Sequence, residues 1–146
     1  MATLASVATQ AVPLEKTTVM AAKIVKLGSA RSADEGIRLG TVRRPPRGVP
    51  KSDFAKRDFY DVWLPILSPS QELVSMALAA PDEQTWKSFT RKFKAEMNQP
   101  GAARTLDLLA ALSHQTNFSL GCYCDDENHC HRSILRQLLA ERGAVL

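Results

Sequence analysis

Short apolar runs in the first half of the chain predict strands. Residues 23–28 carry three aliphatic side chains and end at a glycine, and residues 36–42 alternate apolar and polar positions. Both patterns are typical of strands. Residues 61–67 are again apolar, but Pro65 makes this segment an edge strand or an irregular connector. We therefore expect two strands and one edge segment in this half of the chain.

The second half shows the spacing of amphipathic helices. Ser68 is the expected N-cap of a helix, and the proline and Gln71 that follow it predict that this helix continues through residue 78. Asp82 can cap a second helix. The apolar face of that second helix comprises Trp86, Phe89, Phe93 and Met97. We expect this face to pack in the core rather than to bind a cofactor.

Two further helices and one more strand complete the pattern. A third helix is expected over residues 102–115, and its inward face comprises Leu106, Leu109, Ala110 and Leu112. Alternate apolar positions from residue 118 to residue 124 predict a buried strand. A final helix begins near Cys130 and stops at Gly143, with the apolar positions Ile134, Leu135, Leu138 and Leu139.

Helices that alternate with strands favour a sheet covered on both faces. We expect an α/β fold: a single three-layer α/β/α Rossmann-like domain with a mostly parallel sheet over residues 23–146. Residues 1–22, rich in Ala, Thr and Val, are expected to form a disordered N-terminal extension. Neither Gly-x-Gly-x-x-Gly nor the P-loop pattern is present, so no standard nucleotide fingerprint accompanies this fold.

The composition is that of a globular protein with a mild positive charge. Of 146 residues, 45% are hydrophobic and 23% are charged, and the formal net charge is +4. No apolar run approaches the roughly 20 residues of a membrane span, so we expect no membrane partner. The positive charge favours a small anionic ligand, and nucleic acid is a weaker alternative. All three cysteines lie within nine positions, which favours the reducing cytoplasm over a secreted disulfide scaffold.

Residues 121–133 gather much of the reactive chemistry of the chain, because they contain all three cysteines, two histidines and an arginine. This segment lies where the last strand gives way to the last helix, whose first turn offers free N–H groups. We predict that Cys124 ends the strand and projects into a crevice at the carboxyl edge of the sheet. One interpretation is a catalytic site with Cys124 or Cys130 as the nucleophile. His131 would then be the acid/base, and Arg132 would hold an anion.

Three alternatives to this catalytic interpretation remain open. A zinc site would use Cys122, Cys124, Cys130 and either His129 or His131, although Cys-x-Cys is not the usual knuckle spacing. A redox pair would lack the Cys-x-x-Cys spacing of thioredoxin-like motifs. The cysteines can also be structural, packing as small apolar side chains. We therefore predict no cofactor, with zinc as the alternative.

A second cluster of positive charge occupies residues 43–48, Arg-Arg-Pro-Pro-Arg-Gly, directly after a predicted strand. The segment can therefore lie at the same sheet edge as the cysteines. Its prolines restrict the chain, which lowers the entropic cost of directing guanidinium groups at a phosphate. Arg43 and Arg47 are the candidate anion-binding residues, and Arg47 is the preferred one. The alternative is a basic turn that pairs with surface acids.

Several motifs follow, in the same order, those of a known family. They are Arg43-x-x-Pro46-Arg47-Gly48, Asp61-x-Trp63-Leu64-Pro65, Ser68-Pro69-Ser70-x-Glu72-Leu73, Trp86-x-x-Phe89, and Cys124 through Cys130-His131-Arg132. With these motifs the chain resembles the domain-of-unknown-function 488 family over about residues 23–142, and its Pro-Arg-Gly turn looks most like the YeaO-like branch. The resemblance implies an α/β/α domain in a bacterial cytoplasm, and it supplies no reaction.

Two departures from that family limit what the resemblance implies. Members often carry an aspartate just before the first arginine, where this chain reads Thr41-Val42-Arg43. The YeaO-like branch often lacks the Cys-His-Arg element that this chain keeps. From the residues themselves we expect a small enzyme or ligand-binding domain that acts on a phosphate- or nucleotide-like anion at the Cys/His/Arg site. The alternatives are a non-enzymatic metal-binding or redox module and a nucleic-acid-associated basic protein.

Overall fold

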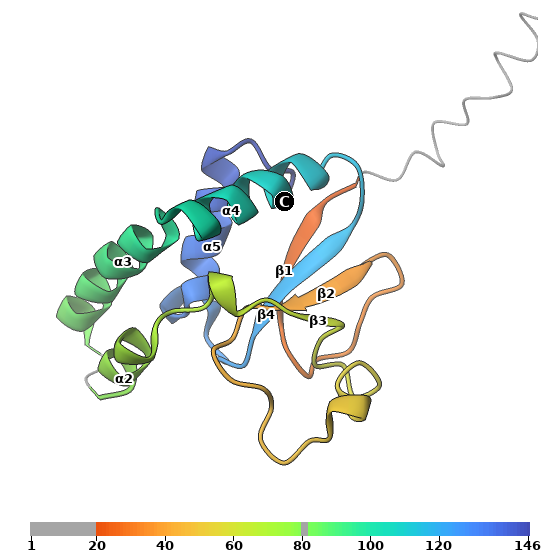
Figure 1. The fold of residues 1–146 in the computed structure, drawn as a ribbon, viewed down its shortest axis with the longest axis horizontal. Helices are drawn as coiled ribbons and strands as arrows, with labels where there is room; N and C mark the ends of the chain where they lie inside the picture. The colour runs from red at the N-terminus through yellow and green to blue at the C-terminus, as the bar shows by residue number, and fades with distance from the viewer. Residues whose placement is uncertain (1–19, 80–81) are drawn as a thin grey trace, which may run out of the picture.

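A four-stranded parallel sheet with the order β1-β4-β2-β3 organises the fold (Figure 1). The computed structural model describes residues 20–79 and 82–146. Of the extension expected over residues 1–22, residues 1–19 lie outside the described residues. The strands are β1 (Ala22–Lys26), β2 (Ile37–Gly40), β3 (Val62–Trp63) and β4 (Phe118–Cys122). Every pair of neighbouring strands is parallel, so the predicted α/β class and parallel sheet are confirmed.

The last strand in the sequence lies in the middle of the sheet. β4 pairs with β1 on one side and with β2 on the other, and all its residues are buried. Leu120 pairs with Ile24 and with Leu39, so aliphatic side chains from three strands share one face of the sheet. A central strand buried on both faces is expected to be apolar or small at every position, as the sequence Phe-Ser-Leu-Gly-Cys is.

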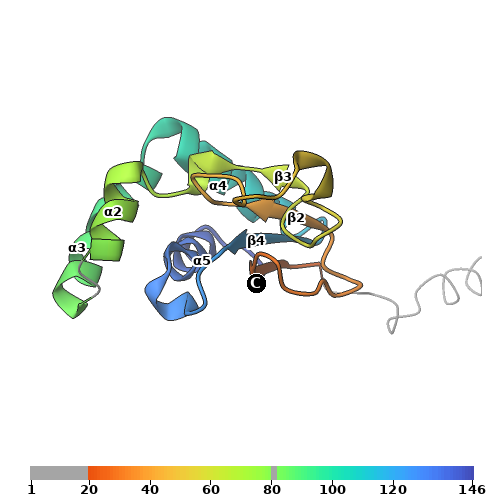
Figure 2. The same ribbon diagram turned by 90° about the horizontal axis from the view of Figure 1, so that it is seen from below.

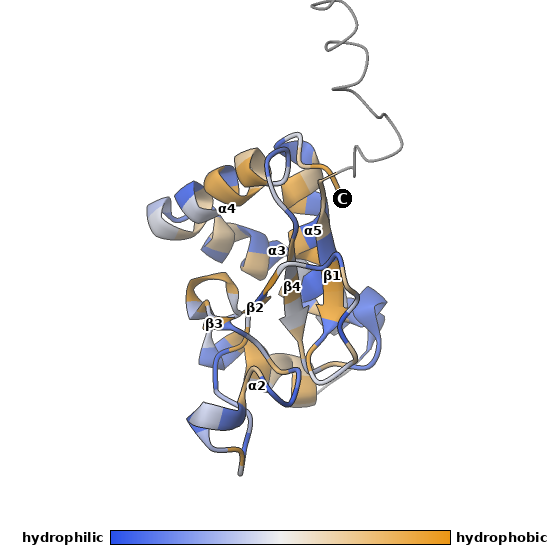
Figure 3. Cartoon of the chain, turned by 90° about the vertical axis from the view of Figure 1, so that its right-hand side faces the viewer, coloured by the Kyte–Doolittle hydropathy of each residue, from blue (hydrophilic) through white to orange (hydrophobic). Residues whose placement is uncertain are grey.

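Four α-helices lie on the side of the sheet that carries Leu120. They are α2 (Gln71–Ala79), α3 (Glu83–Met97), α4 (Pro100–Leu112) and α5 (His131–Glu141). The strands lie on one side of the molecule and α2 and α3 on the other, with α4 and α5 between them (Figures 1 and 2). Hydrophobic and hydrophilic residues alternate along α4 and α5 (Figure 3). The main core joins their apolar sides to those of β4 and α3, including Leu120, Phe93, Leu106, Leu135 and Leu139.

Connecting segments cover the opposite face of the sheet in the part of the chain that the structure describes. Arg38 on β2 and Ser119 on β4 are fully buried there, and both donate hydrogen bonds to the Glu35 carboxylate, at 2.6 Å each. Leu27 and Tyr60 form a second apolar cluster on this side with Cys122. No helix of the described residues is long and apolar enough to cross a membrane.

The helix starts differ from the expected ones at two places. Asp82 caps α3 as predicted, because its carboxylate accepts from the Thr85 N–H at 2.7 Å. The expected cap of α2 by Ser68 is wrong. The Ser68 hydroxyl donates to the Pro65 carbonyl at 2.6 Å, at the end of a short 3-10 turn (Pro65–Leu67), and Ser70 accepts from the Leu73 N–H instead.

The expected starting point of α4 and the expected end of the last strand are also wrong. α4 begins at Pro100 rather than at residue 102, because proline is well suited to the first position of a helix. Leu112, expected to face inward, is 36% exposed at the end of that helix. β4 ends at Cys122, since its neighbours β1 and β2 end at the positions that pair with Cys122 and Gly121. Cys124 therefore lies beyond the strand and is exposed.

Candidate functional site

The carboxyl ends of β2 and β4 bring the two polar segments of the sequence together. Because the two strands are parallel neighbours, Thr41 and the arginine segment leave the sheet beside the segment that carries the cysteines. The Thr41 N–H donates to the Gly121 carbonyl at 2.9 Å. Farther out, the Tyr123 hydroxyl donates to the Arg44 carbonyl at 3.0 Å. The two segments are therefore joined at both points.

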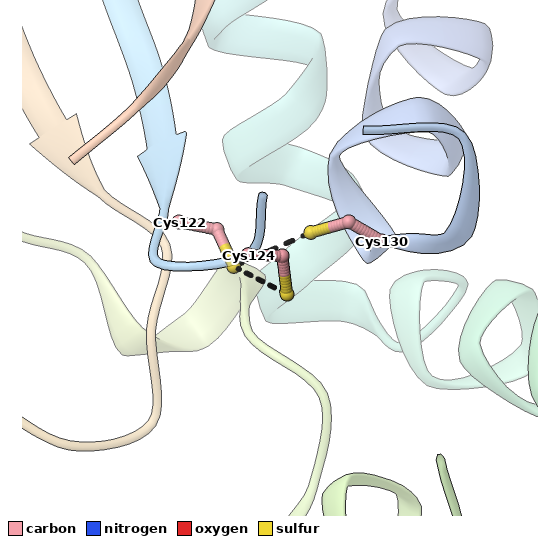
Figure 4. Close-up of side chains that lie close together, drawn as sticks. All are labelled: Cys122, Cys124 and Cys130. Carbon is pink, nitrogen blue, oxygen red and sulfur yellow. Dashed lines mark hydrogen bonds between the residues drawn. The ribbon is translucent and has the colours of Figure 1, made fainter. Parts of the chain in front are cut away.

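The three cysteine side chains point toward one another (Figure 4). Cys122 ends β4, Cys130 precedes the first residue of α5, and Cys124 lies on the connection between them. The Cys122 Sγ atom lies 3.5 Å from that of Cys124 and 3.3 Å from that of Cys130. All three sulfurs lie within 4.8 Å of one another. Cys122 and Cys130 are buried and Cys124 is exposed, so the cluster opens to the outside at Cys124.

The environments of the three thiols differ. Hydrogen bonds with Cys122 and Cys124, together with one to His131, lower the pKa of Cys130 against the opposing effect of burial. Hydrogen bonds with Cys124 and Cys130, with burial added, raise the pKa of Cys122. The pKa of Cys124 is raised to about 11, because the hydrogen bond with Cys130 and burial outweigh the lowering effect of Cys122. A single thiolate in this cluster is therefore best accommodated on Cys130, at the positive end of α5.

His131 is buried behind Cys130 and is held in one orientation. Its Nε2 atom lies 2.6 Å from the Thr41 carbonyl oxygen, which can only accept a hydrogen bond, so Nε2 carries the proton. The Nδ1 atom then has the lone pair, and it lies 3.6 Å from the Cys130 Sγ atom. The ring of Phe93 packs edge-on against the imidazole at 5.6 Å. Cys130, His131 and Thr41 thus form a chain of thiol, base and orienting acceptor.

Arg132 and His129 lie outside this chain of contacts. Arg132 is buried, and its Nη2 group donates to the Cys124 carbonyl at 2.7 Å, so it fixes the backbone of that cysteine. Its Nε atom has no hydrogen-bond partner among the described residues. The exposed His129 ring binds the Asp126 carboxylate, with Nδ1 at 2.9 Å. Within residues 20–79 and 82–146, the three cysteines are the side chains whose ligand atoms lie close enough together to hold one metal ion, and His129 is not among them.

A cavity of about 380 Å³ lies beside the sulfurs. We call it the thiol cavity, and its lining includes Cys122, Cys124, Cys130, His129, His131, Arg43, Arg44, Trp86 and Phe89. Most of the predicted site residues are therefore brought together. Arg47 is exposed and is not among the residues that line the cavity, and neither is Arg132.

The two lining arginines are held by different partners. Arg43 donates to the carbonyl oxygens of Pro69 and Ser68, at 3.1 and 3.3 Å. Arg44 donates to the side-chain oxygen of Gln71 at 3.2 Å. Among the described residues neither guanidinium forms an ion pair, so both positive charges are available to a ligand in the cavity.

The aromatic part of the cavity was expected to be core alone. Trp86 and Phe89 stack with ring centroids 5.3 Å apart and an interplanar angle of 13°, and both line the cavity. Phe89 is also part of the buried core, so one helix face serves both purposes. Sequence reasoning missed this second role, and it missed Thr41. The sequence places Thr41 within the expected strand over residues 36–42, two positions before Arg43, and gives no signal for its contact with His131.

A family model matches most of the chain. The model DUF488-N3a, described as the active DUF488-N3 subclade, matches residues 22–143. This range runs from β1 through α5 and includes the residues that define the thiol cavity. No curated protein and no solved structure matches the chain.

Proposed function

The chain belongs to the DUF488 family, and we propose that it is a small enzyme that acts on a nucleotide-like anion in the thiol cavity. The observation that carries this proposal is the meeting of thiols, arginines and stacked aromatic rings around one cavity. The word active in the description of the matching subclade favours an enzyme over a purely structural domain.

The charge of the cavity supports an anionic ligand. Arg43 and Arg44 line it, and the carbonyl oxygens that hold Arg43 restrict its guanidinium group before any ligand arrives. A restricted guanidinium loses less conformational entropy when it binds a phosphate. The anionic part of the ligand is therefore assigned to the end of the cavity formed by these two arginines.

The aromatic wall supports a ligand with a flat ring. Trp86 is half-buried and offers a ring that stacks on the buried Phe89, and apolar side chains such as Val42 and Val74 line the cavity with them. A free phosphate gains nothing from such a surface, whereas a nucleobase can stack on it. Of the two ligand classes expected from the sequence, a nucleotide-like molecule therefore fits better than phosphate alone.

The chain of Cys130, His131 and Thr41 supplies the reacting groups. His131 Nδ1 accepts the thiol proton, and the Cys130 sulfur forms a bond to an electrophilic atom of the ligand. The bond to the leaving group breaks with its electron pair, and the leaving group takes the proton from His131. Water or a second acceptor then displaces the sulfur. The Cys124 sulfur lies within 4.8 Å of the Cys130 sulfur, and Arg132 fixes the backbone of Cys124.

The test is a calorimetric titration of the reduced protein with three ligands: a nucleoside monophosphate, the corresponding nucleoside and inorganic phosphate. We expect the nucleotide to bind best, because it alone uses both the arginines and the aromatic wall. Arg44→Gln should weaken nucleotide binding about tenfold or more, the value of one charge-assisted hydrogen bond.

The matched control is Arg91→Gln, which removes the same charge from an exposed position of α3 away from the cavity. It should leave the affinity for the nucleotide unchanged. The proposal fails if none of the three ligands binds the wild-type protein, or if the Arg44 and Arg91 variants weaken binding equally.

A further inference from the structure

We propose that the three cysteines also form a binding site for one zinc ion, held by the sulfurs of Cys122, Cys124 and Cys130, with a fourth coordination position open toward the thiol cavity. The observation behind this proposal is the mutual approach of all three sulfurs to within 4.8 Å. The proposal goes beyond the function proposed above and does not depend on any ligand in the cavity.

The spacing of the sulfurs suits a tetrahedral zinc ion. Zinc–sulfur bonds of about 2.3 Å in a tetrahedron place neighbouring sulfurs about 3.8 Å apart. The sulfur of Cys122 lies 3.5 Å from that of Cys124 and 3.3 Å from that of Cys130. Small side-chain rotations would therefore suffice to bring the three sulfurs to the distances that zinc requires. A disulfide, in contrast, joins only two sulfurs and leaves the convergence of the third unexplained.

The fold places two of the three ligands at the ends of regular elements. Cys122 is the last residue of β4, and Cys130 directly precedes α5, so the sheet and the helix fix their separation. Cys124 lies on the connection, where the bond from Arg132 to its carbonyl oxygen fixes its backbone. A site built on rigid elements loses little entropy when the ion binds. Three thiolates and one zinc ion leave one net negative charge, which the nearby Arg132 and the N-terminus of α5 counter.

Neither nearby histidine completes the site. The Nδ1 atom of His131 lies 3.6 Å from the Cys130 sulfur but is not within 4.8 Å of all three sulfurs, and His129 binds Asp126 at 2.9 Å. Within the described residues the ligand group contains the three cysteines and no histidine. All three cysteines line the thiol cavity, so the fourth position is open to water or to a ligand there. Three protein ligands with one open position are the arrangement of reactive rather than purely structural zinc sites.

Zinc binding would control the chemistry proposed for Cys130. Zinc coordination takes one lone pair of the Cys130 sulfur and lowers the electron density on it, so the zinc-loaded protein should form that bond more slowly than the metal-free protein. The arginines and the aromatic wall are not zinc ligands, and nucleotide binding at them should persist in the loaded protein. Zinc would thus slow the covalent step while the ligand still binds.

The test uses the full chain, reduced and freed of metal under anaerobic conditions, and then titrated with zinc against a chromophoric chelator. We expect one zinc ion per chain. X-ray absorption of the loaded protein should show three sulfur neighbours at about 2.3 Å and one lighter neighbour. Cys124→Ser should weaken zinc binding by about a hundredfold or more, since even the loss of an outer-shell partner costs ten- to a hundredfold. Because Cys124 is exposed, this variant should keep the fold, which its thermal unfolding curve will show.

The control variant is His129→Asn, which removes the nearest exposed histidine and should bind zinc as the wild type does. The proposal is overturned if zinc does not bind saturably, if Cys124→Ser binds it as tightly as the wild type, or if His129→Asn loses it. A protein that forms a disulfide and takes up no zinc after reduction also overturns it. Failure here leaves the nucleotide titrations untouched, so the two proposals can be judged separately.

Discussion

The Nε2 atom of His131 lies 2.6 Å from the carbonyl oxygen of Thr41, although 90 positions separate the two residues in the sequence. The contact joins the first turn of α5 to the end of β2. Thr41 also bonds the Gly121 carbonyl of β4 through both its N–H and its hydroxyl, at 2.9 and 3.0 Å. One fully buried threonine therefore connects three elements and fixes the tautomer of the histidine.

We expect Thr41→Val to destabilise the protein by about 1 kcal/mol, the net value of one buried hydrogen bond. The substitution removes the hydroxyl, which bonds the Gly121 carbonyl and lies 3.1 Å from the His131 Nε2 atom, and keeps the Thr41 carbonyl, which holds that Nε2 atom at 2.6 Å. Nucleotide affinity should therefore stay the same while the free energy of unfolding, measured in urea, falls. Thr105→Val is the control, because its hydroxyl also bonds a carbonyl, that of Gly101, but at an exposed position. An equal loss of stability in both variants would contradict the role given to Thr41.

The two arginines that line the thiol cavity should matter more for ligand binding than Arg47. The sequence made Arg47 the preferred anion-binding residue, but it does not line the cavity, whereas Arg43 and Arg44 do. We expect Arg47→Gln to change nucleotide affinity by less than about twofold, whereas Arg44→Gln weakens it about tenfold. Both variants remove one positive charge from the same short segment. At one salt concentration the long-range effect of that lost charge is therefore the same, and any difference in affinity reflects direct contact with the ligand. A larger loss from Arg47→Gln would move the anion site outside the cavity.

Trp86→Leu should separate nucleotide binding from phosphate binding. Stacking of a base on an aromatic side chain contributes about 1–3 kcal/mol, so the affinity for a nucleoside monophosphate should fall about fivefold or more. Inorganic phosphate serves as the internal control, because it makes no use of the ring. A calorimetric titration of the variant with both ligands measures the difference. If the two affinities change together, the aromatic wall does not recognise the ligand.

Local patterns were enough to predict most elements of the fold. The apolar face of α3 and its Asp82 cap follow directly from the spacing of side chains along a helix, and both are found. The position of β4 between β1 and β2 was not predictable in this way, because strand order depends on pairing between residues that are distant in sequence. The start of α2 was missed because Ser68 bonds to Pro65 in a competing 3-10 turn.

The candidate site was predictable only where it is local in sequence. The three cysteines and His131 lie in one short segment at a strand–helix junction, where free N–H groups gather, and the structure brings their side chains to one cavity. Thr41 acts on His131 through a backbone carbonyl, which every residue has and no side-chain pattern reveals. Trp86 has the spacing of a core residue, so its second role depends on which segments pack beside α3.

Gly40→Ala should destabilise the protein, whereas Gly101→Ala should not. A Cβ atom at position 40 would lie 2.4 Å from the buried ring of Tyr60, which packs against Phe54 at 5.2 Å and cannot easily move. We expect a cost of about 1–3 kcal/mol, typical of an overpacked core. A Cβ atom at position 101 meets only the end of the exposed Ile66 side chain, at 2.9 Å, and alanine favours the helix there. The change in the free energy of unfolding, measured in urea, should therefore have opposite signs for the two variants, or the loss should be clearly larger for Gly40→Ala.

Glu35 should make the stability of the protein depend on pH. Its buried carboxylate accepts from Arg38 through Nε at 2.6 Å and Nη2 at 2.9 Å, and from the Ser119 hydroxyl at 2.6 Å. Burial raises the pKa of Glu35, but the bonds from Arg38 and Ser119 outweigh this effect and hold the pKa below its usual value. A carboxyl group with a lower pKa in the folded state stabilises the fold above its unfolded pKa of about 4.3. That contribution is lost as the pH falls through the lower pKa of the folded state.

We therefore expect the free energy of unfolding in urea to fall as the pH is lowered from 7 to 3, and part of this fall should be absent in Glu35→Gln. At pH 7 the variant should be less stable than the wild type by about 3–5 kcal/mol, because it leaves the Arg38 charge buried without its partner. Asp34→Asn is the matched control, since Asp34 pairs with Lys23 at an exposed position and should contribute little. A wild-type protein whose acid dependence equals that of Glu35→Gln would show that this buried pair is not responsible.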